Sequence, residues 1–111
     1  MIRKTCAVIG LLVLISDIAI AQPAGLPLTV GRLSYDDRSK ENVQQIAVKN
    51  ETERKINYLV VQCGFFQKGE LFATGIRTVT NIFPQTTGFA EIRYAGLPAD
   101  RAECRISEVH Y

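Results

Sequence analysis

The chain has 111 residues, with 13 Lys and Arg against 11 Asp and Glu, and a formal charge of +2. Hydrophobic residues make up 47% and charged residues 22%, the proportions of a packed chain, which exclude a disordered tail and a protein with several membrane spans. A chain of this length forms one domain at most. Because the charge is small and no basic cluster concentrates it, nucleic acid is not an expected partner.

The first 21 residues, MIRKTCAVIGLLVLISDIAIA, have the organisation of a secretory signal peptide. Arg3 and Lys4 give a basic start, Ala7 to Ile15 form an apolar run, and residues 19–21 end it in a small-x-small pattern. The run is nine residues long, whereas a membrane span needs about 20. We therefore predict a signal-peptide helix over residues 1–21, cleavage after Ala21, a periplasmic or secreted protein, and no stable membrane span after cleavage.

Two cysteines, Cys63 and Cys104, remain after this cleavage, because Cys6 lies in the discarded peptide. In an oxidising compartment such a pair is expected to form a disulfide. A zinc site is disfavoured because there is no C-x-x-C spacing and His110 alone cannot complete a four-ligand set with two thiolates. Redox catalysis is disfavoured by the same missing spacing. We predict a structural disulfide, no metal and no cofactor.

The rest of the chain alternates short strand-like runs with turn-forming clusters. Residues 22–28 (QPAGLPL) contain two Pro and one Gly and are predicted to be an extended lead-in to a domain over residues 29–111. Runs rich in β-branched and aromatic residues then recur, which predicts strands. These runs are Thr29–Tyr35, Val43–Asn50, Ile56–Gln67, Leu71–Ile82, Gly88–Ala95 and Ala102–Val109. One alternative stays open: residues 34–48 could form a short helix capped by Asp36 or Asp37.

The run INYLVVQCGFFQ, residues 56–67, indicates the centre of a sheet, because both of its faces are largely apolar. Several antiparallel strands within about 90 residues are typical of an immunoglobulin-like sandwich. We therefore predict an all-β domain of this class with five to seven strands. In it the third and last strands are neighbours, which would let Cys63 and Cys104 meet.

Phe65 and Phe66 are the candidate partner contact, because adjacent strand residues face opposite ways and one of the two must leave the core. The other large aromatic side chains could line a groove, but a sandwich of this size needs about that many to fill its two inner faces, so we expect core positions. The complete set is Tyr58, Phe65, Phe66, Phe72, Phe83, Phe89 and Tyr94.

The segment IAVKNETERKINYLVVQCGFFQKGELFATGIRTVTNIFPQTTGFAEI, residues 46–92, resembles the FxLYD-like family of secreted bacterial immunoglobulin-like domains. The features that align are the strand ending at Asn50, the polar turn after it, the turn at residues 68–70, and Pro84 with Phe89 after it. Residues 65–67 and 85–86 depart from the family pattern. The resemblance implies an immunoglobulin-like fold and export, and it transfers no catalytic residue.

No residue pattern indicates catalysis. His110 stands beside the C-terminal residue, where chains commonly fray, so we expect it to be exposed and not to act as a base. Asp36 and Asp37 lack a calcium-loop pattern and are expected in a solvated turn. The sequence Asn50-Glu51-Thr52 fits a glycosylation acceptor, yet Asn is expected to shape the turn there.

The function that we expect is a non-catalytic exported module for protein interaction or envelope structure, with another envelope protein or a second copy of itself as partner. The alternative is a small secreted enzyme inhibitor, using the loop Pro84–Gly88 or Pro98–Asp100, or a hydrolase-type enzyme.

Overall fold

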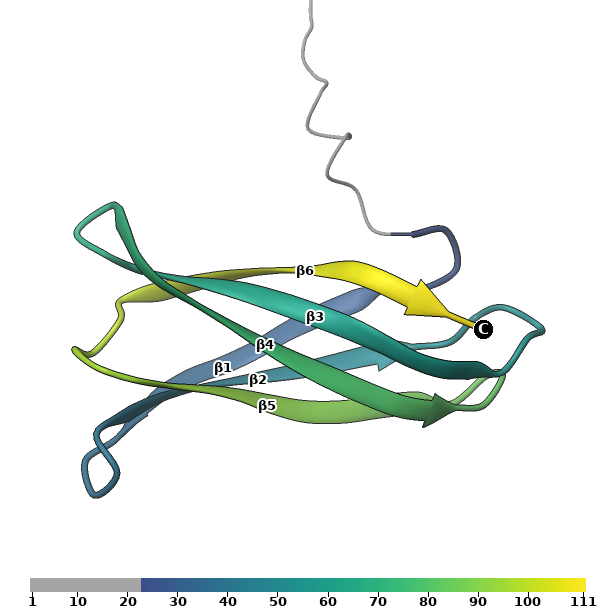
Figure 1. The fold of residues 1–111 in the computed structure, drawn as a ribbon, viewed down its shortest axis with the longest axis horizontal. Helices are drawn as coiled ribbons and strands as arrows, with labels where there is room; N and C mark the ends of the chain where they lie inside the picture. The colour runs from purple at the N-terminus through teal and green to yellow at the C-terminus, as the bar shows by residue number, and fades with distance from the viewer. Residues whose placement is uncertain (1–22) are drawn as a thin grey trace, which may run out of the picture.

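The computed structural model describes residues 23–111, and in this range every regular element is a β-strand. The predicted signal peptide, residues 1–21, lies outside the described residues. Six strands follow one another along the chain (Figure 1). They are β1 Leu28–Asp36, β2 Glu41–Lys49, β3 Ile56–Gln67, β4 Glu70–Ile82, β5 Thr87–Ala95 and β6 Arg101–His110.

The strands form two antiparallel sheets, ordered β1-β2-β5 and β4-β3-β6, which pack face to face (Figure 1). These orders correspond to strands A-B-E and C′-C-F of an immunoglobulin domain. The predicted immunoglobulin-like β-sandwich is therefore confirmed, with six strands. The predicted strand ends agree with the observed ends to within two residues. The helical alternative for residues 34–48 is wrong, because this segment contains the end of β1, a turn and most of β2.

The core consists mainly of aliphatic side chains from the facing rows of the two sheets. From β3, the inner row Leu59, Val61, Cys63 and Phe65 is fully buried. Opposite it, β2 and β5 contribute the buried side chains Ile46, Val48 and Ile92. Leu26, from the predicted lead-in, is also fully buried in this core. β3, whose two apolar faces predicted the centre of a sheet, is the central strand of sheet β4-β3-β6.

Most of the aromatic residues expected in the core lie at the surface. Among them only Phe65 is fully buried, whereas Phe72, Phe83, Phe89 and Tyr94 are exposed. For Phe89 the reason is strand alternation, because it lies between Gly88 and Ala90 of β5, whose positions face the core. A Cβ atom at Gly75 would lie 2.9 Å from Cγ2 of Ile92, and one at Gly88 would lie 3.0 Å from Cγ1 of Val79. β4 therefore approaches β5 closely at these glycines, and the ring of Phe65 packs beside Gly75, with its Cε2 atom 3.5 Å from the same Cβ position.

Candidate functional site

The disulfide predicted from the sequence is confirmed, and it joins Cys63 of β3 to Cys104 of β6. The two residues stand directly opposite each other in the β3–β6 register, with their Cα atoms 4.0 Å apart. Cys63 is fully buried. The bridge links neighbouring strands of one sheet, and its position in the core gives it a structural role.

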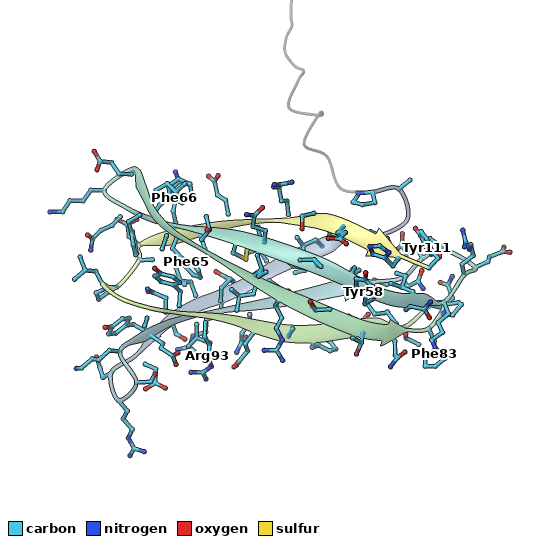
Figure 2. All side chains as sticks on the ribbon, viewed as in Figure 1. Tyr58, Phe65, Phe66, Phe83, Arg93 and Tyr111 are labelled. Carbon is cyan, nitrogen blue, oxygen red and sulfur yellow. A yellow bond between two sulfur atoms is a disulfide. The ribbon has the colours of Figure 1, made fainter. Side chains whose placement is uncertain are left out.

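Phe65 and Phe66 face opposite sides of β3 (Figure 2). Phe65 is fully buried and stacks with Tyr94 of β5, with 6.2 Å between the ring centroids. Phe66 lies on the outer face of the sheet, half-buried, with the Arg101 guanidinium 4.0 Å above its ring. Phe66 is thus the residue that leaves the core. The sequence contained a signal for this choice, because Phe65 has the same strand parity as Cys63.

A hollow of about 410 Å³ lies on the outer face of sheet β4-β3-β6, and we call it the outer-face groove. It is lined by Gln62, Gly64, Phe66, Leu71, Thr74, Glu103, Cys104 and Arg105. Gly64 gives the groove its depth, because a Cβ atom there would come within 2.9 Å of Leu71 Cδ1 and 3.5 Å of Phe66 Cε1. Leu71 is 56% exposed, so the groove presents apolar surface to solvent.

The rim of the outer-face groove along β6 is charged. Arg101 forms an ion pair with Glu103 in addition to its contact with the Phe66 ring. Arg105 donates from Nη2 to the side-chain oxygen of Gln62 at 2.8 Å. An apolar centre with arginines at its edge is the composition that protein–protein interfaces favour.

The outer face of the other sheet differs, because charged side chains dominate it. Arg93 of β5 pairs with Asp36, Glu41 and Glu91 at 3.7, 3.1 and 3.4 Å, and the hydrogen bond to Glu41 raises its pKa. Phe89 is the exception, since 78% of it is exposed. It stands beside a smaller hollow of about 300 Å³.

His110 does not fray as the sequence suggested. It pairs with Tyr58 in the β3–β6 register, and the two rings stack with centroids 4.3 Å apart. Its Nε2 atom lies 2.6 Å from a carboxylate oxygen of Glu108. The imidazole is exposed, as expected. The pairing of His110 with β3 orders it, and the local sequence does not predict this pairing because the partner strand is distant in the chain.

Asn50 shapes the turn after β2, as expected. Its side chain is fully buried. The amide nitrogen donates to the carbonyl oxygens of Arg54 and Ile82 at 2.8 and 3.0 Å, while Oδ1 accepts from the N–H and the hydroxyl of Thr52. An amide nitrogen committed in this way is not available as a glycosylation acceptor.

Asp36 also fulfils the expected role in a turn. Hydrogen bonds from the N–H groups of Arg38 and Ser39 hold the pKa of its carboxyl below the usual value. The turn between β1 and β2 is closed by a further hydrogen bond from the N–H of Lys40 to the carbonyl oxygen of Asp36.

Sequence reasoning missed the buried amide of Asn42, which holds the loop between β5 and β6. Its Nδ2 donates to the carbonyl oxygen of Leu97 at 2.8 Å, and its Oδ1 accepts from the N–H of Ala99 at 2.7 Å. Leu97 itself is 64% exposed on this loop. No local pattern marks Asn42, because its burial comes from a loop more than fifty residues away in the chain.

No helix within residues 23–111 is long and apolar enough to cross a membrane. In the same range no three His, Cys, Asp or Glu side chains gather as metal ligands would. No protein-family model, curated protein or solved structure shows a significant match to the chain. The resemblance to the FxLYD-like family therefore stays a prediction.

Proposed function

We propose that the protein is a non-catalytic, exported interaction module that binds another envelope protein through the outer-face groove. The observation that carries this proposal is the position of Phe66. Its ring lies on the outer face of the central strand, beside the exposed Leu71 and above the floor that Gly64 leaves open. An aliphatic or aromatic side chain of a partner can enter such a groove and be desolvated by its walls.

The charged rim favours a protein as the occupant. Arg101 keeps its guanidinium over the Phe66 ring, which supports the ring in one orientation before binding. A partner therefore meets a groove that is already formed, and its binding costs little ordering entropy. The arginines and Glu103 at the rim can select a partner by charge.

Export is supported by two independent features. The first 21 residues have the composition of a signal peptide. The Cys63–Cys104 disulfide belongs in an oxidising compartment, such as the periplasm or the extracellular space.

The test is affinity capture from an envelope extract with three forms of the protein: wild type, Phe66→Ser and Phe89→Ser. Phe89→Ser is the matched control, because it removes an exposed ring from the opposite sheet. We expect wild type and Phe89→Ser to recover the same protein, and Phe66→Ser to lose it while its thermal unfolding remains cooperative. Equal recovery with all three forms would exclude the outer-face groove as the binding surface.

A further inference from the structure

The outer-face groove lies between two rows of side chains that face one another across sheet β4-β3-β6. Gly64 of β3 stands between the two rows and forms the floor. The groove therefore has two different walls, and the chemistry of each wall decides which occupant fits. One row consists of Leu71, Phe66 and Arg101, and the other consists of Ile76, Gln62 and Arg105.

The wall at Phe66 and Leu71 is apolar. Both side chains reach over the floor, since a Cβ atom on Gly64 would lie 3.5 Å from Phe66 Cε1 and 2.9 Å from Leu71 Cδ1. The charge of Arg101 in this row is already compensated, because its guanidinium lies over the Phe66 ring and pairs with Glu103. This wall therefore offers apolar contact to an occupant.

The wall at Arg105 carries a positive charge that no carboxylate of residues 23–111 compensates. The Arg105 guanidinium reaches across to β3, where Nη2 donates to the side-chain oxygen of Gln62 at 2.8 Å. No ion pair in this range includes Arg105, and Glu103 beside it is engaged by Arg101. A guanidinium with a neutral partner keeps its charge and further N–H donors for a carboxylate of another molecule.

The distance between the apolar wall and the free charge sets a spacing for the partner. Gln62 and Gly64 are two residues apart on one face of β3, which corresponds to about 7 Å. An extended segment that lies along β3 presents its own residues i and i+2 on one face at the same spacing. An apolar side chain at one of these positions lies above Gly64 and against Phe66, while a carboxylate at the other position lies at Arg105.

We propose that the outer-face groove recognises an extended segment of its protein partner that carries an apolar residue and, two positions away, an Asp or Glu. The apolar side chain fills the space above Gly64, and the carboxylate forms an ion pair with Arg105. This inference rests on the proposed function and deepens it, because it names the chemistry of the partner. Arg105 is then the specificity-determining residue, since a partner with Lys or Arg in place of the acidic residue is rejected by repulsion between like charges.

Peptides selected from a random display library on the purified, disulfide-intact protein test the inference. The baits are wild type, Arg105→Glu and Arg38→Glu, the last of which makes the same charge change in the β1–β2 turn. We expect wild type and Arg38→Glu to enrich peptides in which an acidic residue stands two positions from an apolar one. Arg105→Glu should instead enrich peptides with Lys or Arg at that position.

Isothermal titration calorimetry with one selected peptide measures the contribution of the ion pair. Arg105→Glu is expected to weaken the binding of this peptide by at least about tenfold, whereas Arg38→Glu should bind it as wild type does. Replacing the acidic residue of the peptide by Lys should weaken its binding to wild type and restore most of the affinity for Arg105→Glu, because the opposite charges are exchanged.

Phe66→Ser identifies the peptides that bind in the groove, because their enrichment should depend on this ring. Gly64→Val is the second variant if Phe66→Ser fails to fold. It fills the floor, and the atom that it meets first is the flexible end of Leu71.

Two results would overturn the inference. Groove-dependent peptides without an acidic preference, or an affinity that Arg105→Glu leaves unchanged, would remove Arg105 from recognition and leave the proposed function standing. No enrichment, or enrichment that neither groove variant reduces, would exclude an extended segment as the occupant. The capture experiment with envelope extract then decides the proposed function separately.

Discussion

Reducing the Cys63–Cys104 disulfide should destabilise the sandwich without changing its architecture. The bridge joins residues that already face each other in the β3–β6 register. The antiparallel ladder between these strands therefore remains when the bridge is cut. The main effect falls on the unfolded chain, which regains the freedom of a closed loop.

The size of the effect follows from the length of that loop. The two cysteines are 41 residues apart in the chain, and for a loop of this length the chain-entropy estimate is about 4 kcal/mol. A domain of this size has a free energy of unfolding of about 5 to 15 kcal/mol. Each kcal/mol moves the thermal midpoint of such a small domain by about 4 to 8 °C, so reduction should lower it by about 20 °C.

Urea unfolding followed by circular dichroism, with and without reductant, measures this change directly. Cys104→Ala is the matched variant, because Cys104 is only half-buried and its truncation leaves less of a cavity than truncation of the fully buried Cys63. Reduction and Cys104→Ala should agree within about 1 kcal/mol. Coincident unfolding curves for the oxidised and reduced wild type would refute the reasoning, because they would mean that the bridge does not constrain the unfolded chain.

Two further predictions concern the turns. Asn50→Ala removes four hydrogen bonds from a buried site, and it should lower the free energy of unfolding by about 3 kcal/mol, since the partners left behind are unsatisfied; an unchanged urea midpoint would contradict this. The lowered pKa of Asp36 means that its contribution to stability is present above about pH 4, the value for the unfolded chain, and is lost as the pH falls through the folded pKa. The stability difference between wild type and Asp36→Asn should therefore shrink on acidification through this range, and a difference that is constant with pH would show that the Asp36 carboxylate is not stabilised by the turn.

The order and extent of the strands could be predicted from the sequence. Alternation of apolar side chains with a period of two, interrupted by clusters of turn residues, is a local property of the chain. For this reason β3 was identified with its observed bounds, and its apolar faces indicated the central position that it occupies. The disulfide followed as well, because only two cysteines remain beyond the predicted signal peptide.

The candidate site depended on more than this local pattern. The sequence singled out Phe65 and Phe66 together, and the tertiary structure assigned Phe65 to the core and Phe66 to the outer-face groove. Gly64 of β3 forms the floor of the groove and Leu71 of β4 forms its wall. The register between these two strands brings them together, and the alternation within one strand does not specify that register.

The sequence by itself determined that this chain forms strands, where they begin and end, and which cysteines are available to join. Only the tertiary structure decided which face of each strand is covered and which polar side chains are buried with it. The amide of Asn42, for example, is buried because a loop distant in the chain covers it. The burial of a side chain depends on the elements that pack against its strand, and the sequence of one strand does not specify those elements.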